Sequence, residues 1–230
     1  MKTIGLIGGM SWESSSMYYT IINKTMKERL GGLHSAKCIL YSVNFEEIAS
    51  LQHQGAWEKL TKLMINFAQQ LQRAGADFVV ICTNTMHKMA PEIQDNINIP
   101  LLHIADATGE MITEQGLRKP GLLGTKFTME EDFYKKRLQQ KYSIDVLIPS
   151  SADREIIDDV IYNELCMGIL KQSSRDKFKE IIKNLVSIGA DGMILGCTEI
   201  PLLISQKDVE VPLFDTTTIH SKAAVDFALQ

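Results

Sequence analysis

The sequence predicts an α/β fold with parallel sheets, and two observations support this prediction. Short β-rich apolar runs alternate along the chain with longer segments of helical spacing. In one such segment, residues 174–188, apolar residues from Phe178 to Val186 recur at helical intervals and form a stripe along one face. Strands that alternate with helices of this length are typical of βαβ units, in which the strands run parallel.

We expect eight strands, joined by helical segments such as residues 56–74. In chain order, the expected strands are 3–8, 37–43, 77–82, 100–104, 120–124, 144–149, 192–196 and 211–214. The first is short and interrupted by glycines, so we expect a buried strand rather than a signal peptide or a membrane span.

Composition and charge narrow the class of function. Of the 230 residues, 45% are hydrophobic and 23% are charged, which is ordinary for a soluble globular protein. The formal net charge is −4 and no basic block stands out. Neither nucleic acid nor an anionic membrane is therefore an expected partner.

The chain contains an internal repeat. GADFVVICTNTM, residues 75–86, resembles GADGMILGCTEI, residues 189–200, and a gapless alignment sets Thr83 against Cys197. A second match at nearly the same spacing aligns residues 5–19 with 121–134. It pairs Gly5 with Gly121, Gly8 with Gly124 and Tyr18 with Tyr134. Two matches at one spacing predict a duplicated α/β unit.

Parallel sheets bind ligands at the carboxyl ends of their strands, and four predicted strand ends carry small or polar residues. They are GGMS (8–11), CTNT (82–85), GTKFT (124–128) and GCTE (196–199). Where a helix follows, the exposed N–H groups can bind a carboxylate. If the two halves face each other, Thr83 and Cys197 would approach a small ligand from opposite sides.

The four cysteines have different predicted roles. They show no CxxC and no His partner at metal spacing, which predicts a reduced, cytoplasmic protein without a metal site. Cys38 and Cys166 are expected to be small buried hydrophobes. Cys82 ends an apolar run and alternates in direction with Thr83, so it is predicted to lie in the core. Cys197 stands at a predicted helix start, where a helix N-terminus would lower the pKa of its thiol.

Two other signals carry less weight. The glycines of GLIGGM do not form the G-x-G-x-x-G fingerprint of a dinucleotide-binding site. His87 and His103 lie near the expected ligand site, but isolated histidines of this kind are predicted to be structural. No HExxH motif or carboxylate cluster indicates a metal.

GLIGGMS near the start, a CNT-type turn in the first half and GCTE in the second resemble the aspartate/glutamate racemase family over nearly the whole chain. The resemblance implies two pseudo-symmetric, three-layer α/β domains, each with a parallel four-stranded sheet, and an active site in the cleft between them. We expect residues 1–98 with 210–230 in the first domain and residues 99–209 in the second. The family resemblance also implies that the protein is a homodimer and needs no cofactor.

In this family, one catalytic cysteine comes from each domain. The second matches Cys197, but Thr83 stands where the first cysteine would precede Asn-Thr. Racemisation needs a base on one face of the α-carbon and an acid on the other. Cys197 as thiolate can take a proton, whereas Thr83 can return one or relay it from water but can hardly take one. The resemblance assigns the second-domain cysteine to the L form, so we expect an enzyme that favours L-aspartate or L-glutamate.

Substrate binding is expected from seven residues near the strand ends. Asn84, Thr85 and Thr198 offer donors to the α-carboxylate. Met10 and Ser11 would form the bottom of the substrate-binding site, and Thr125, from the matching turn of the second half, would lie opposite them. Gln52 is the expected contact for the distal carboxylate, although a neutral amide lacks the charge that an arginine would bring. In the second half, NELCMG offers Glu164 where a cationic residue would otherwise stand.

Two other functions remain open from the sequence. One is a single-thiol decarboxylase of malonate-type substrates on the same fold, in which one face needs only a proton donor. The other is a non-catalytic amino-acid-binding protein in which Cys197 is incidental.

Overall fold

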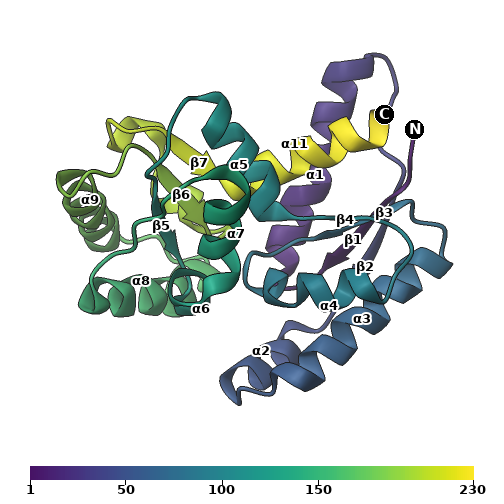
Figure 1. Cartoon of the computed structure of the whole chain (residues 1–230), viewed down its shortest axis with the longest axis horizontal. Helices are drawn as coiled ribbons and strands as arrows, with labels where there is room; N and C mark the ends of the chain where they lie inside the picture. The colour runs from purple at the N-terminus through teal and green to yellow at the C-terminus, as the bar shows by residue number, and fades with distance from the viewer. The chain divides into compact units, whose positions relative to one another are not determined.

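The computed structural model describes all 230 residues and divides them into two compact units. The first unit comprises residues 1–104 and 220–230, and the second comprises residues 105–219. Each unit contains one parallel β-sheet with helices packed around it (Figure 1). The predicted α/β fold with parallel sheets is therefore confirmed.

The sheet of the first unit has four parallel strands in the order β2-β1-β3-β4. They are β1 (Ile4–Gly8), β2 (Cys38–Ser42), β3 (Phe78–Ile81) and β4 (Leu101–Leu102). The two central strands, β1 and β3, are buried along their whole length. This explains why they read as continuous apolar runs rather than as alternating patterns.

Helices cover both faces of this sheet. They are α1 (Trp12–Leu30), α2 (Phe45–His53), α3 (Trp57–Arg73), the 3-10 helix η1 (Thr85–Met89), α4 (Ala90–Asp95) and α11 (Thr216–Leu229). One apolar cluster joins the sheet to α2, α3, η1 and α4, and a second joins it to α1 and α11. The first unit is thus a three-layer α/β/α sandwich. Its chain ends lie together, because Lys2 N–H donates to the Ala228 carbonyl (2.8 Å).

The second unit has a smaller sheet than the sequence suggests. Its three parallel strands, in the order β5-β6-β7, are β5 (Gly121–Gly124), β6 (Met193–Gly196) and β7 (Leu213–Asp215). The expected fourth strand, residues 144–149, forms only one bridge, between Leu147 and Gly121. Pro149 follows two residues later and has no N–H with which to extend the ladder.

The unit boundaries differ from the predicted ones at both crossings. Residues 99–104 were expected in the second domain but belong to the first unit. Residues 210–219 were expected in the first domain, but β7 pairs with β6 and so belongs to the sheet of the second unit. The chain enters the second unit after Ile104 and returns to the first at His220. Helix α5 (Ile104–Glu114) begins at the first crossing, and α11 runs through the second.

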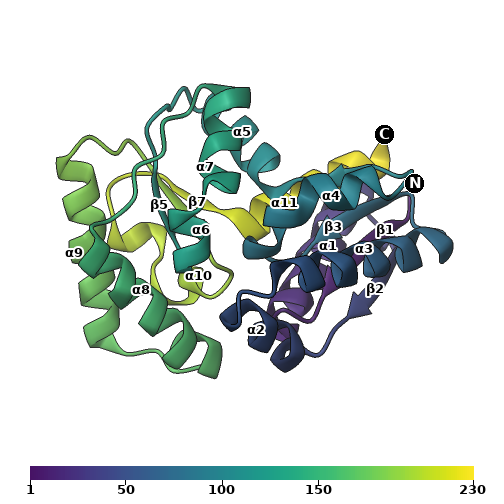
Figure 2. The same cartoon turned by 60° about the horizontal axis from the view of Figure 1, so that its bottom comes forward.

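Helices also cover both faces of the second sheet, with α9 on one side and α7 on the other (Figure 2). Besides α5, they are α6 (Lys126–Glu130), α7 (Asp132–Tyr142), α8 (Ser151–Asn163), α9 (Gln172–Ser187) and α10 (Ile200–Leu203), with 3-10 turns η2 (Leu165–Met167) and η3 (Gln206–Asp208). The predicted stripe on α9 is buried from Phe178 to Leu185, whereas Val186 is exposed. Asp106 on α5 forms ion pairs with Arg137 and Lys141 on α7 and ties these helices together. No helix of the chain combines the length and the apolar character that a membrane crossing requires.

Candidate active site

The backbone register shows which residue of the first unit ends the strand beside β1. Ile7 of β1 pairs with Ile81 of β3, and the Cys82 N–H donates to the Ile7 carbonyl (2.9 Å). Cys82 therefore stands beside Gly8, the last residue of β1. Thr83 is the first residue beyond this pair.

The second unit repeats the arrangement with Cys197 in the corresponding place. Gly124, the last residue of β5, pairs with Gly196, the last residue of β6. Cys197 is the first residue beyond that pair. Thr83 and Cys197 thus occupy equivalent positions in the two sheets, in agreement with the gapless alignment of the repeat.

Cys82 lies in the hydrophobic core, as predicted. Its side chain is fully buried in the cluster that also contains Tyr18 of α1 and Val225 of α11. Burial raises the pKa of the Cys82 thiol far above its ordinary value. Its carbonyl accepts a hydrogen bond from the Ser14 hydroxyl (2.8 Å). Cys82 is therefore an inert core residue that anchors the backbone just before Thr83.

The other two cysteines are less buried than expected. Cys38, on strand β2, and Cys166, in η2, are both partly exposed. Partial burial raises the pKa of the Cys38 thiol. Neither forms a disulfide.

Cys197 sits in a tight turn with a carboxylate beside it. Its Sγ donates a hydrogen bond to Oε2 of Glu199 (2.9 Å), and the Thr198 hydroxyl donates to the same oxygen (2.6 Å). The Glu199 side chain is largely buried, with 8% exposure. Burial, the charge of Glu199 and this hydrogen bond raise the pKa of the Cys197 thiol well above its ordinary value.

The predicted lowering of the Cys197 pKa by a helix terminus is therefore wrong. Helix α10 has only four residues and begins at Ile200, three positions after the cysteine. The Ile200 N–H donates to the Cys197 carbonyl (3.3 Å), so it is not aimed at the thiol. The raised pKa keeps Cys197 as a thiol that is hydrogen-bonded to the Glu199 side chain, an arrangement suited to proton transfer on demand.

Sequence reasoning overlooked two residues around Cys197. Glu199 stood inside the quoted GCTE motif, but its contact with Sγ depends on the conformation of the turn. Tyr162 of α8 is the second. Burial raises the pKa of its hydroxyl, and nearby Asp158, Cys197 and Cys166 add to the effect. Tyr162 thus lies within electrostatic reach of the reactive thiol.

In the first unit, the structure gathers the predicted binding residues around the Thr83 turn. Asn84 and Thr85 follow Thr83 directly and are buried at the start of η1. Gln52 of α2 is buried, and its amide donates to the sulfur of Met86 in η1 (3.1 Å). The Gln52 side chain therefore lies against the turn that carries Thr83.

Met10 and Ser11 occupy the turn after β1. Met10 is buried in the same apolar cluster as Met86 of η1. Ser11 caps α1, because its hydroxyl accepts from the Ser14 N–H (3.3 Å). Gly9, between β1 and these residues, has a φ of +88° and adjoins the backbone of Val43 so closely that a Cβ would overlap it.

In the second unit, Thr125 caps α6 at the end of β5 and is buried beside Thr128. Glu164, which stands where a cationic substrate contact would otherwise be expected, is bound to neighbouring side chains of its own unit. Its carboxylate is bound by the Ser174 hydroxyl (2.5 Å) and the Lys171 ammonium (3.0 Å) of the α9 region, and these bonds lower its pKa. Glu164 therefore secures the loop after η2.

Comparison with known proteins shows which class of enzyme has this fold. Residues 7–224 match the sequence model of the Asp/Glu/Hydantoin racemase family. Because this match covers almost the whole chain, the protein belongs to that family. The resemblance inferred from GLIGGMS and GCTE is confirmed.

Individual relatives fit the same class. A crystal structure described as a candidate Asp/Glu racemase from Yersinia pestis is 54% identical, with a TM-score of 0.95 and full coverage of both chains. An aspartate racemase homologue from Pyrococcus horikoshii OT3 is 38% identical, with a TM-score of 0.87 and full coverage of both chains. The broad-specificity amino-acid racemase RacX of Bacillus subtilis strain 168 is 24% identical over 96% of each chain. Racemases are isomerases, and the protein falls in that enzyme class.

Proposed function

We propose that the protein is a cofactor-independent racemase of aspartate or glutamate that favours the L enantiomer. The observation that supports this most is the equivalent placement of Thr83 and Cys197. Thr83 follows Cys82, which stands beside Gly8 at the end of β1, and Cys197 follows Gly196, which pairs with Gly124 at the end of β5. With family membership, this placement assigns one proton-transfer residue to each unit. Thr83 takes the position at which the family resemblance implies a cysteine.

The first proton transfer in this proposal starts at Cys197. The Glu199 carboxylate accepts the thiol proton along the existing hydrogen bond, and the resulting thiolate removes the α-proton of the L substrate. The thiol is regenerated with the substrate's proton. Glu199 remains protonated until it releases its proton to solvent.

The second transfer takes place on the opposite face of the α-carbon. The Thr83 hydroxyl gives its proton to the carbanion and regains one from water. A D substrate would present its α-proton to Thr83, whose hydroxyl is essentially never ionised near neutral pH. Net conversion between the enantiomers must be equally efficient in both directions, because L and D amino acids have the same free energy. The asymmetry lies in α-proton exchange, which we expect to be fast for the L form at Cys197 and slow for the D form at Thr83.

Charge stabilisation and recognition fall to neutral groups. We assign Asn84, Thr85 and the backbone N–H of Thr198 to the α-carboxylate, where hydrogen-bond donors lower the energy of the developing carbanion. The Thr198 hydroxyl already donates to Glu199. We also assign Met10 and Ser11 of the first unit and Thr125 of the second to substrate binding. Gln52, held against Met86, is the proposed contact for the distal carboxylate. The relatives described as aspartate or Asp/Glu racemases favour a dicarboxylic substrate.

Chiral chromatography tests this function. Purified protein is incubated with each enantiomer of aspartate, glutamate and alanine, without added cofactor. We expect conversion of L-aspartate or L-glutamate and none by Cys197→Ser. A preference for alanine over both acids would contradict the substrate assignment. Release of carbon dioxide from a malonate, without any racemisation, would instead support a decarboxylase.

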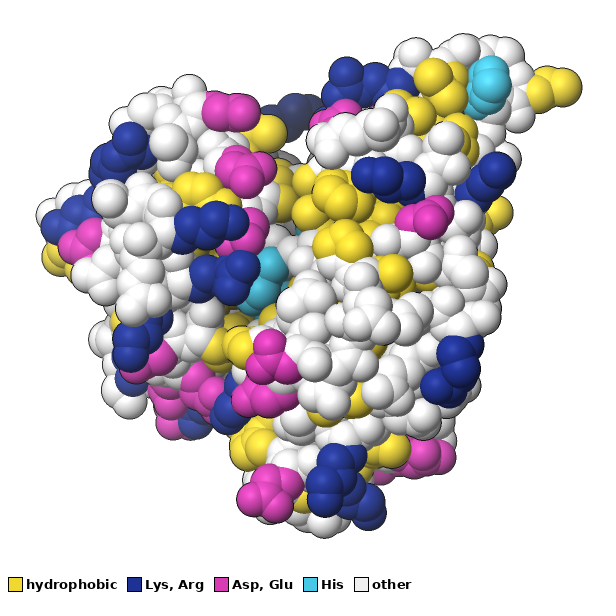
Figure 3. Space-filling view, turned by 45° about the vertical axis from the view of Figure 1, so that its right-hand side comes forward, with side chains coloured by type: hydrophobic (Ala, Val, Ile, Leu, Met, Phe, Trp, Pro, Cys, Tyr) yellow, Lys and Arg dark blue, Asp and Glu magenta, His cyan; other side chains and the backbone are white.

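We also propose that the protein works as a homodimer in the cytoplasm. All four cysteines lack disulfides, which suits a reducing compartment. Large apolar side chains are exposed along α1 and the loop after it, including Trp12 (68%), Tyr19 and Leu33 (103%), and Figure 3 shows apolar side chains on this projecting loop. Light scattering after size-exclusion chromatography should give twice the mass of one chain, and a single-chain mass would refute the dimer.

A further inference from the structure

Three histidines form a buried cluster in the first unit, close to the Thr83 turn. The rings of His87 and His103 lie 4.7 Å apart between centroids, and those of His87 and His220 lie 5.6 Å apart. His87 has 1% exposure and His220 none. The proton transfers proposed above use none of these histidines.

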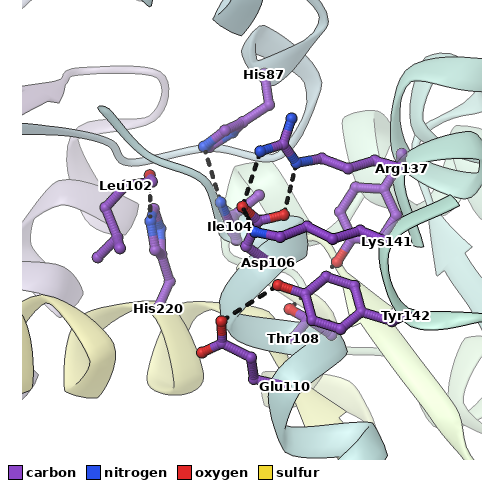
Figure 4. Close-up of polar contacts among 11 residues, drawn as sticks. His87, Leu102, Ile104, Asp106, Thr108, Glu110, Arg137, Lys141, Tyr142 and His220 are labelled. Carbon is purple, nitrogen blue, oxygen red and sulfur yellow. Dashed lines mark hydrogen bonds and ion pairs between the residues drawn. The ribbon is translucent and has the colours of Figure 1, made fainter. Parts of the chain in front are cut away.

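The partners of His87 fix its tautomer. Nδ1 lies 2.8 Å from the Thr83 carbonyl, which can only accept, so Nδ1 carries the hydrogen. Nε2 lies 3.2 Å from the Ile104 N–H, which can only donate, so Nε2 is the acceptor. One neutral ring therefore bridges the backbone of Thr83 and that of Ile104; Figure 4 shows its bond to Ile104.

His220 has the opposite tautomer. Its Nε2 lies 2.9 Å from the Leu102 carbonyl and must donate to it (Figure 4). Its Nδ1 then accepts from the Tyr18 hydroxyl of α1 (2.9 Å). Both rings are thus neutral bridges between backbone or side-chain groups from different elements.

The hydrogen bonds of His87 and His220 involve the residues at which the chain passes from one unit to the other. Ile104 is the last residue before the first crossing, and His220 is the first residue after the second. On the other side, the Ser14 hydroxyl holds the Cys82 carbonyl (2.8 Å), so two successive carbonyls of the Thr83 turn are bound by side chains. The backbone of Thr83 is therefore fixed to the core of its unit and to the chain crossings.

We propose that His87 is a positioning residue, whose neutral bridging ring holds Thr83 in place for reprotonation of the substrate. This inference rests on the proposed racemase function. Misplacement of a reacting group by a fraction of an ångström slows a transfer steeply, so a turn held by two carbonyl bonds favours a fixed donor. The ring does not touch the substrate in this account and acts only through Thr83.

The surroundings of His87 keep its ring neutral, which is the form that the two hydrogen bonds require. Burial lowers the pKa of His87 well below its ordinary value, and the neighbouring His103 and His220 lower it further. Tyr18, which binds His220, is the other titratable group in the network. A second proton on His87 would set two N–H donors against each other at Ile104, so the bridge requires the neutral ring.

Two substitutions separate the halves of the bridge. In His87→Asn, the amide nitrogen can take the place of Nδ1 and still donate to the Thr83 carbonyl. In His87→Gln, the amide oxygen can take the place of Nε2 and still accept from Ile104. The Asn variant therefore keeps the bond to Thr83 and loses the bond to Ile104, whereas the Gln variant does the reverse.

The readout compares two rates for L-aspartate in deuterated water. Loss of the α-proton needs only the Cys197 face, whereas formation of D-aspartate also needs Thr83. We expect His87→Gln to lower the ratio of D-product formation to α-proton loss about tenfold, with α-proton loss within about twofold of wild type. His87→Asn should keep the ratio within about twofold. Equal losses of both rates in both variants, or an unchanged ratio in His87→Gln, would overturn the proposal.

A measurement independent of activity tests the bridge itself. Nitrogen NMR of the wild-type rings should show His87 protonated at Nδ1 and not at Nε2, and the Ile104 amide should exchange with deuterium faster in His87→Asn than in His87→Gln. Protonation at Nε2, or equal Ile104 exchange in both variants, would overturn the bridge. If wild-type protein exchanges no amino acid but shows these NMR signatures, the racemase function fails while the bridge stands.

Discussion

Replacement of Glu199 by glutamine should lower the pKa of the Cys197 thiol. The carboxylate oxygen lies 2.9 Å from Sγ, so ionisation of the thiol places two negative charges side by side. At that distance the repulsion is about 6 kcal/mol at an effective dielectric constant of about 20, and about 1.4 kcal/mol in bulk water. The Cys197 side chain is partly exposed, which favours the lower part of this range. We therefore expect the pKa of the Cys197 thiol to fall when the charge of Glu199 is removed.

The same substitution should slow catalysis, because the amide cannot accept the thiol proton. Removal of a general base typically costs about 10²–10⁴-fold in rate. Glu199→Gln should therefore combine a more easily ionised thiol with much slower conversion of L-aspartate. A purely structural carboxylate would not produce this pair of opposite changes.

The assay is the pH dependence of iodoacetamide modification, followed at Cys197 by peptide mass spectrometry. The modification midpoint should move to lower pH in Glu199→Gln. Glu180→Gln, which removes an exposed carboxylate from α9, is the matched control and should leave the midpoint unchanged. A midpoint that stays constant or rises in Glu199→Gln would refute the role assigned to the carboxylate.

Three further predictions concern proton exchange at Thr83 and the contributions of Gly9 and Asp106 to stability. Thr83→Cys should gain α-proton exchange of D-aspartate, measured by NMR, because a thiol can serve as a base; no gain would count against the role of Thr83. Gly9→Ala should lower the free energy of unfolding in urea by about 1–3 kcal/mol through overlap with the backbone after β2. Gly31→Ala, which has positive φ but open space around it, should cost about 1 kcal/mol. Asp106→Asn should lower the free energy of unfolding by about 1–3 kcal/mol through loss of the bond to Arg137.

The Asp106 prediction carries a pH dependence. Burial would raise the pKa of this carboxyl, but its bonds to Arg137 and Lys141 outweigh burial and lower it. A carboxyl with a lowered pKa in the folded state stabilises the protein above its unfolded pKa of about 3.9 and loses that effect as pH falls through the folded value. The difference between wild type and Asp106→Asn should therefore be full at neutral pH and shrink below about pH 4. A difference that grows on acidification would contradict the ion pair.

Short-range sequence patterns correctly predicted the central strands and the burial of Cys82. Apolar runs located the central strands because both of their faces are buried, and side-chain alternation placed Cys82 in the core because direction reverses at each residue. The internal repeat predicted equivalent positions for Thr83 and Cys197, because residues that align in the two copies follow equivalent strands. Residues 144–149 also looked like a strand, but pairing depends on neighbours that the sequence pattern does not specify, and the segment forms a single bridge.

The site was harder to predict where chemistry depends on the shape of a turn. The sequence suggested a helix start at Cys197, yet α10 begins at Ile200, and the turn instead brings the Glu199 carboxylate to the thiol. Burial, together with that contact, raises the pKa of the thiol instead of lowering it. The link from His87 to Ile104 spans seventeen residues of sequence and depends on the packing of η1 against the end of β4. Neither contact has a signature in residue spacing.

The central claim is that Cys197 removes the α-proton of an L-dicarboxylic amino acid and that Thr83 cannot do the same for the D form. Proton NMR in deuterated water tests it directly, with L- and D-aspartate and L- and D-glutamate incubated separately without cofactor. We predict much faster loss of the α-proton signal from an L substrate than from its D enantiomer, and no loss with Cys197→Ser. Equal exchange of both enantiomers, or exchange that survives Cys197→Ser, would contradict the account.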